Sequence, residues 1–332
     1  MKKLVIIFTV LSIIITFSCK RKSDGNIKLP DHVKADVEIL RYEKALFTLD
    51  VNNIGPGLRK LDKQYHVFIQ GNYSDTLKLM DLKSYLTDTN MINIFDACQK
   101  EFPELKQLEE EFSEVFGYLL HYFPGTSIPK IYSYVSGINY EQPVDFLDSL
   151  LLIGLDNYLG TDFIYYKWYR IPEYRSENMS REYLIPDCIH EIARSKTDFR
   201  NSNRTLLDRM IYEGKLLYFA DLMLPETNDA YKIGFTQDQL AWCEKYQADI
   251  WSFFIEEDLI FSTDIAVINK FILDGPFTGS ISKEAPAKLG VWIGWQIVRK
   301  YMNENPGLNL NELLIQADAQ KILQESRYKP RK

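Results

Sequence analysis

Apolar positions recur at helical spacing along most of the chain. The clearest stripe lies within residues 104–122 and consists of Leu105, Leu108, Phe112, Val115, Leu119 and Tyr122. Glutamates fill the opposite side of this segment, which is typical of a helix that buries one face in a core. With Gly and Pro as stop signals, similar patterns predict helices at 57–70, 78–86, 147–158, 186–196, 206–224, 236–254, 264–273, 286–302 and 309–326. For 186–196 the alternative is a longer, kinked helix that is capped by Ser180.

One segment follows a different pattern. Residues 128–140 are rich in β-branched and aromatic side chains, which predicts a strand with a break near Gly137. The sequence shows no internal repeat and no second domain boundary. The expected fold is therefore one mainly α domain (α+β) with a small β-sheet, spanning residues 34–332.

Residues 161–175 are unusually aromatic. Their large side chains are Phe163, Tyr165, Tyr166, Trp168, Tyr169 and Tyr174. A run of this kind is expected to form part of the core, because large aromatic side chains are mostly buried. The alternative is a binding surface.

The first 18 residues are predicted to be a lipoprotein signal peptide. A short basic start precedes an apolar run at 4–15, which is too short for a membrane-spanning helix of about 20 residues. Ser18 and Cys19 then resemble the end of a bacterial lipobox, although Thr16 and Phe17 depart from its strictest form. The alternatives are a plain cleaved signal peptide with an incidental cysteine and an uncleaved anchor.

A lipobox makes Cys19 the acylated amino terminus of the mature protein. Several acyl chains, palmitate among them, anchor a protein stably, since each buried methylene contributes about 0.8 kcal/mol. Residues 19–33 are polar and without periodicity, which predicts a tether between the lipid and the globular part. The expected location is the cell envelope, anchored to a membrane and facing the periplasm, with the choice of membrane left open.

The composition restricts the kind of binding partner more than it restricts the fold. The 332 residues include 46% hydrophobic side chains, as in an ordinary globular protein. A net charge of −7 and a pI near 5.3 argue against a nucleic-acid partner. Besides Cys19, the cysteines are Cys98, Cys188 and Cys243. An odd number without short spacing predicts neither a disulfide framework nor a thiolate metal site, although one disulfide between two of them stays open.

The most distinctive chemistry lies around His190. Glu191 follows it directly, Arg194 lies four residues after it, and Glu213 lies on the next predicted helix. Zinc peptidases of the His-Glu-x-x-His type bind the metal through two histidines four residues apart, and the intervening Glu orients the attacking water. In one large subgroup the third ligand is a Glu on the next helix. This chain carries the first histidine and both glutamates, with Arg194 at the position of the second histidine.

Arg194 changes what such a site can hold. A guanidinium has no free lone pair, so it cannot bind zinc, and at about 4 Å it repels a cation by several kcal/mol. We expect instead a structural ion pair between Arg194 and Glu213 that links the two helices. His190, Glu191 and Glu213 are then vestigial catalytic residues, and no metal or cofactor is expected.

Two other interpretations of the motif remain open. The first is a histidine unconnected with any peptidase ancestry. The second is an active metalloenzyme that uses His190 and Glu213 with a third ligand from elsewhere. The remaining histidines, His32, His66 and His121, lie far upstream in unrelated contexts.

A glycine pair marks a second feature. Gly290 and Gly294 are four residues apart on a predicted helix, beside Trp292 and Trp295. Small residues at this spacing let two helices approach closely. Because the segment is short and flanked by basic residues, we expect packing within a soluble domain rather than dimerisation in a membrane.

Several segments resemble the gliding motility lipoprotein B (GldB) family. They are the lipobox ending at Cys19, Gly154–Gly160, Ile171–Arg175, Ile211–Lys215, Tyr218–Phe219, Leu224–Pro225 and Gly290–Val298. The resemblance implies a membrane-anchored component of the gliding machinery and of the associated protein secretion, with other gliding proteins as partners. The family is distantly similar to predicted zinc-dependent proteases, which implies a zinc-peptidase-like (gluzincin-like) helical fold. The family has no established catalytic activity, which favours an accessory role.

We therefore expect a lipid-anchored, periplasm-facing, non-catalytic protein that is required for gliding motility, a pseudo-metallopeptidase. The first alternative is an active zinc metallopeptidase that uses His190, Glu191 and Glu213. The second is a periplasmic module that binds peptide or glycan through the aromatic run at 163–174.

Overall fold

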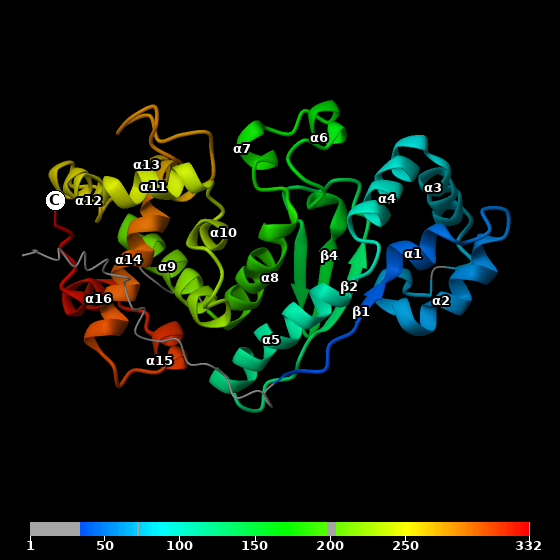
Figure 1. Cartoon of the computed structure of the whole chain (residues 1–332), viewed down its shortest axis with the longest axis horizontal. Helices are drawn as coiled ribbons and strands as arrows, with labels where there is room; N and C mark the ends of the chain where they lie inside the picture. Colours follow the sequence, from blue (N-terminus) through cyan, green and yellow to red (C-terminus); the bar gives the residue numbers. More distant parts are fainter. Residues whose placement is uncertain (1–33, 72, 198–203, 332) are drawn as a thin grey trace, which may run out of the picture.

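The computed structural model describes residues 34–71, 73–197 and 204–331. The signal peptide, Cys19 and the tether predicted for residues 1–33 lie outside the described residues. The described part of the chain is mainly helical, with one small sheet near its centre (Figure 1). The predicted mainly α, α+β class is thereby confirmed.

The sheet has four strands in the order β1-β2-β4-β3. Their bounds are β1 (Ile39–Arg41), β2 (Lys130–Tyr134), β3 (Val144–Leu147) and β4 (Leu150–Gly154). β2 is parallel to both β1 and β4, whereas β3 pairs with β4 as an antiparallel hairpin. β2 lies within the predicted strand 128–140, and the chain turns after it at Gly137, whose φ is 76°.

The helix predicted at 147–158 is wrong. Residues Leu150–Gly154 form β4, and a single 3₁₀ turn, Leu155–Asn157, follows it. β4 pairs with strands on both sides and is buried on both faces, so its sequence is a continuous apolar run without alternation. The period of so short a run does not distinguish a buried strand from a buried helix.

Side chains that alternate along the central strands pack into two cores. Ile131 and Leu151 belong to the larger core, whereas their neighbours Tyr132 and Leu152 belong to the smaller one. The helices of the smaller core are α1 (Tyr42–Phe47), α2 (Ile54–Ile69) and α3 (Thr76–Thr87). They lie on one side of the sheet, with most of the later helices on the other (Figure 1).

The remaining helices are α4 (Thr89–Glu101), α5 (Lys106–Tyr122), α6 (Ile164–Trp168), α7 (Glu173–Ser176), α8 (Arg181–Lys196), α9 (Leu206–Met223), α10 (Asp229–Ile233), α11 (Gln237–Lys245), α12 (Gln247–Glu256), α13 (Ile265–Ile272), α14 (Leu289–Glu304), α15 (Leu310–Ile315) and α16 (Ala319–Ser326). The predicted helices that correspond to α2, α3, α5, α9, α13 and α14 are confirmed, with ends that differ by a few residues. α8 begins at Arg181, directly after its N-cap Ser180, and contains Pro186, so the longer of the two helices predicted here is confirmed. α4 and the short helices were not predicted.

Two segments predicted as single helices are each divided. The segment 236–254 forms α11 and α12, which are separated at Tyr246. The segment 309–326 forms α15 and α16, because Asp318 accepts a hydrogen bond from the main-chain N–H of Lys321 (2.9 Å) and begins a new helix as its N-cap.

Helices α9 and α14 approach each other closely. A Cβ at Gly294 would overlap the main-chain carbonyl of Met210 on α9. A Cβ at Gly214 would lie 2.5 Å from the carbonyl oxygen of Gly294. The close helix packing predicted from Gly290 and Gly294 is therefore confirmed, and it brings α9 against the core of the domain.

Candidate functional site

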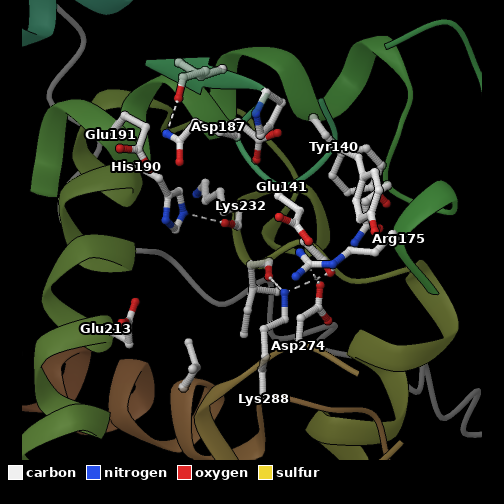
Figure 2. Close-up of a pocket in the computed structure, with 18 of the residues that line it drawn as sticks. Tyr140, Glu141, Arg175, Asp187, His190, Glu191, Glu213, Lys232, Asp274 and Lys288 are labelled. Atoms are coloured by element: carbon white, nitrogen blue, oxygen red, sulfur yellow. Dashed lines mark hydrogen bonds and ion pairs between the residues drawn. The ribbon is translucent and has the colours of Figure 1, made fainter. Parts of the chain in front are cut away.

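The four residues of the peptidase-like motif line one cavity of about 420 Å³. His190, Glu191 and Arg194 come from α8 and Glu213 from α9. Figure 2 shows His190, Glu191 and Glu213 around this space, with Lys232 and Lys288 on neighbouring segments. Other segments of the wall are residues 140–144, 232–234 and 272–274. The volume is within the range of small-molecule sites.

Arg194 lies between the two carboxylates of the motif. Its Nε is 3.3 Å from Glu191 Oε1, and its Nη2 is 3.5 Å from Glu213 Oε2. Arg209, one turn before Glu213 on α9, lies 3.8 Å from the other carboxylate oxygen. The structure thus brings Arg194 and Glu213 together and adds Glu191 to the group. Because the Arg194 side chain is 43% exposed, each such pair contributes about 0–1 kcal/mol to stability.

His190 is neutral, and a hydrogen bond fixes its ring. Its Nε2 lies 2.8 Å from the main-chain oxygen of Lys232. Burial, with a further contribution from the Arg194 charge, lowers the pKa of the imidazole to about 4. A carbonyl oxygen only accepts, so Nε2 carries the proton and the lone pair of the neutral ring is on Nδ1.

The side chains of the motif do not fit a zinc ion. The guanidinium of Arg194 lies beside the Glu213 oxygen that would bind the metal. A divalent ion at that position would be repelled by several kcal/mol. Within residues 34–71, 73–197 and 204–331, no group of three or more His, Cys, Asp or Glu side chains is arranged to hold a metal ion.

Asp187 is a cavity residue that the sequence did not reveal. It lies one turn before His190 on α8, and its Oδ2 accepts a hydrogen bond from the hydroxyl of Tyr158 (2.8 Å). Burial raises the pKa of this carboxyl to about 7, although the Tyr158 hydrogen bond and the charge of Lys288 oppose the shift. The one sequence signal for Asp187 is its spacing of three residues from His190, because that spacing places the two side chains on the same face of a helix.

Replacing Asp187 by asparagine is expected to change the pH dependence of stability. The folded pKa of about 7 lies above the unfolded value, so this carboxyl favours folding at about pH 4 and loses that contribution as the pH rises through 7. An asparagine side chain still accepts the hydrogen bond from the Tyr158 hydroxyl, and it does not ionise. The free energy of unfolding of the variant, relative to that of wild type, should therefore rise by up to about 4 kcal/mol between pH 4 and pH 8. Urea unfolding across this range measures the difference, and a constant difference would contradict the buried carboxyl.

Two cations join the loops around the cavity. Lys288 Nζ donates to the main-chain oxygens of Ile233 (2.7 Å) and Gly234 (3.3 Å). Arg175 Nη1 lies 3.1 Å from Asp274 Oδ2, as Figure 2 also shows. These contacts connect α10, α14, α7 and the segment after α13, so the cavity wall is held together by residues far apart in the sequence.

A largely buried ion network holds α10 in place. Lys232 Nζ lies 3.1 Å from Asp221 and 3.3 Å from Asp229. Arg299 on α14 binds the same two carboxylates, at 2.6 and 2.8 Å. Because the carbonyl of Lys232 accepts from His190, this network also determines where the imidazole lies.

Asp156 fixes the turn that leads to the cavity rim. It is fully buried and accepts hydrogen bonds from the main-chain N–H groups of Ser136 (2.9 Å) and Ile138 (2.5 Å). Gly137 and Ile138 both have positive φ values, 76° and 63°, a conformation that needs such external support in a non-glycine residue. The chain continues directly into the rim at 140–144.

The aromatic run is divided between the core and the surface. Tyr165 and Tyr166 are buried, whereas Trp168 and Tyr169 are 63% and 46% exposed. Core packing therefore explains only part of the run. The run does not line the cavity.

The three cysteines after Cys19 are buried free thiols. Burial raises the pKa of Cys98, Cys188 and Cys243, which keeps them protonated and unreactive at neutral pH. The structure shows no disulfide among them. In the part of the chain that the structure describes, no helix has the length and apolar character of a membrane span.

Fold and site define a mainly helical α+β protein with a cavity that is lined by His190, Glu191, Arg194 and Glu213. Residues 22–330 match the family model of gliding motility protein GldB. The chain therefore belongs to the gliding motility protein GldB family, as the sequence resemblance predicted. No curated protein and no solved structure matches the chain. The similarity to zinc-dependent proteases and the gluzincin-like form of the fold stay predictions.

Family membership supports two general statements about this chain. The family description supports involvement in gliding motility. The family label also marks its members as lipoproteins, which supports a membrane-anchored location in the cell envelope.

Proposed function

We propose that this chain is a lipid-anchored, non-catalytic component of the gliding machinery that faces the periplasm. Its family supports the role in gliding, and the lipobox-like sequence that ends at Cys19 supports the anchor. Its partners are the membrane, through acylated Cys19, and other gliding proteins, with a further role in the associated secretion. This role in gliding requires no cofactor and no nucleic-acid partner.

The observation that carries the non-catalytic role is the placement of Arg194. It occupies the sequence position of the second zinc ligand and contacts both Glu191 and Glu213. Peptidase chemistry of this type needs a metal-bound water beside a free carboxylate base. Here one arginine binds both the base and the third ligand, so His190, Glu191 and Glu213 are assigned to structure rather than catalysis.

Replacing Glu191 by glutamine is expected to leave gliding at the wild-type level. Glutamine keeps the size of the side chain and one acceptor oxygen, but it cannot act as a general base. Loss of a general base lowers the rate of a typical enzyme by about 10²–10⁴-fold. Gliding speed of cells carrying Glu191→Gln measures the effect, with an immunoblot to show equal protein amounts. A gliding defect at equal abundance would argue for catalysis.

Replacing Cys19 by alanine is expected to abolish gliding. The variant cannot be acylated, so it loses the binding that several acyl chains provide. Membrane fractionation and a gliding assay measure the two effects together. Ser23→Ala in the same tether is the matched control and should behave as wild type. Normal gliding with Cys19→Ala released from the membrane would refute the role of the anchor.

The rival function is an active zinc metallopeptidase. It would use His190, Glu191 and Glu213 with a further ligand in place of Arg194, and it predicts one zinc ion per chain. A periplasmic module that binds peptide or glycan is the third possibility. The exposed aromatic rings of Trp168 and Tyr169 favour this binding function, because they are available to contact a ligand.

A further inference from the structure

A second hollow lies beside the amino ends of the parallel strands. Its volume is about 1060 Å³, close to the upper end of the range for small-molecule sites. Residues within 36–40, 63–70 and 128–132 line it, together with Leu150. None of these residues lines the cavity around His190. We call this hollow the sheet-end groove.

The strand register explains why opposite charges meet on the sheet side of the groove. Ile39 of β1 pairs with Ile131 of β2, and both side chains enter the larger core. Glu38 and Lys130 each come one residue earlier, so they lie opposite each other and face the other side of the sheet. α2 closes the groove on that side, because the hydroxyl of Tyr132 donates to a main-chain oxygen of α2 (3.2 Å).

The groove carries two negative and two positive charges that form no ion pair. The carboxylates are those of Asp36 and Glu38, and the ammonium groups are those of Lys63 and Lys130. All four residues are exposed, and none has a charged partner within residues 34–71, 73–197 and 204–331. A ligand of one sign would be repelled by half of these groups. A ligand that carries one positive and one negative group can pair with all of them.

Apolar side chains form the rest of the groove wall. Five of them are half-buried, namely Val37, Leu40, Val67, Ile128 and Leu150. Exposed apolar surface that adjoins charged groups is suited to a ligand with an apolar part and a charged part. The lining therefore matches an amphipathic molecule whose charged end is a zwitterion.

The groove lies at the edge of the molecule where the described chain begins. Figure 1 shows the start of the described chain beside the amino end of β2, and Asp36 in the groove wall comes two residues after Lys34. Residues 20–33 separate Lys34 from Cys19, and a chain of that length spans at most about 50 Å when fully extended. An acylated Cys19 therefore keeps the groove within reach of membrane lipids.

We propose that the sheet-end groove binds a zwitterionic phospholipid whose headgroup carries a phosphate and a primary ammonium, in the membrane that holds Cys19. Lys63 and Lys130 pair with the phosphate, and Asp36 and Glu38 pair with the ammonium. The half-buried apolar side chains contact the glycerol and the first acyl carbons. This binding turns one defined face of the protein towards the membrane. The inference rests on the proposed function in one respect, because it requires the acyl anchor at Cys19.

Photo-crosslinking of the acylated full chain in lipid vesicles tests the proposal. The His66 side chain lines the groove and is 72% exposed, so His66→p-benzoylphenylalanine places a photoreactive ring there. The vesicles contain equal parts of phosphatidylethanolamine and phosphatidylglycerol with identical acyl chains, and mass spectrometry identifies the cross-linked lipid. We expect the phosphatidylethanolamine adduct to exceed the phosphatidylglycerol adduct by about threefold, as one additional exposed ion pair would give.

A second probe position shows whether this preference belongs to the groove. Ser127 is exposed and precedes Ile128, but it does not line the groove. Ser127→p-benzoylphenylalanine is therefore the matched control for the His66 probe, and it should show no preference between the two lipids.

Charge variants in the His66 probe background connect the preference to the four charged groups. Asp36→Asn combined with Glu38→Gln removes the partners of the ammonium and should bring the ratio of the two adducts close to one. Lys63→Gln combined with Lys130→Gln removes the partners of the phosphate and should lower the phosphatidylethanolamine adduct by about threefold. Lys60→Gln changes an exposed α2 residue outside the groove, so it is the control and should behave as the parent probe.

The outcomes separate this proposal from the proposed function. Equal adducts at position 66, the same preference at position 127, or a preference that survives Asp36→Asn with Glu38→Gln would overturn the lipid site. The absence of any lipid adduct at position 66, while the protein floats with the vesicles, would overturn it as well. Each of these results leaves the anchored role in gliding intact. Separation of the acylated chain from the vesicles during flotation would overturn the anchor instead.

Discussion

Replacing Gly294 by alanine is expected to lower the free energy of unfolding by about 3 kcal/mol or more. The new Cβ would overlap the carbonyl of Met210. This obstacle is main chain, which cannot turn aside as a flexible side chain can, so α9 and α14 must move apart. Domains are stable by only about 5–15 kcal/mol, so the loss is a large share of the total. Urea unfolding measures it.

A second glycine serves as the matched control for this experiment. No heavy atom lies within 4 Å of a Cβ built on Gly307. Gly307→Ala should therefore change stability by no more than about 0.5 kcal/mol. If Gly294→Ala were as stable as Gly307→Ala, α9 and α14 would not pack as closely as the structure has them.

Replacing Arg194 by histidine is expected to create a zinc site. The change removes the cation and places an imidazole one turn after His190, on the same face of α8 and towards Glu213. Zinc at one hundred times its Kd would then stabilise the variant by about 2.7 kcal/mol. Elemental analysis after dialysis, together with thermal unfolding with and without zinc, measures both consequences.

Arg194→Gln is the control that separates charge from coordination. It removes the positive charge but supplies no nitrogen ligand, so it should bind no zinc. If Arg194→His bound none either, the charge of Arg194 would not be the reason that the motif rejects zinc. The hydrogen bond between His190 and the Lys232 carbonyl would then be the remaining obstacle.

The parts of the fold that the sequence revealed are those with a clear period. The amphipathic stripe of α5 and the glycine pair of α14 each have a spacing with one structural explanation. β4 has no such period, because burial on both faces removes the alternation that identifies a strand. The division between α15 and α16 has a different cause, because the N-cap residue Asp318 lies within an otherwise continuous helical pattern and does not interrupt its period.

The candidate site was predictable only where its residues share one helix pair. His190, Glu191, Arg194 and Glu213 do meet at one cavity, because α8 and α9 pack against each other. The rest of the wall comes from β-strand ends, loops and short helices between residues 140 and 291. No spacing along the chain relates these segments to one another, so Asn157, Asn178 and Lys288 carried no signal before the fold was known.

The zinc content of the purified wild-type chain tests most directly whether Arg194 has taken the place of a metal ion. The full-length protein is produced in zinc-containing medium, purified without chelators and measured by elemental analysis. If Arg194 prevents coordination, the protein holds far less than one zinc ion per chain, and Arg194→His holds one. One tightly bound zinc ion per wild-type chain that is lost in Glu213→Gln would contradict this and make the cavity a metal site.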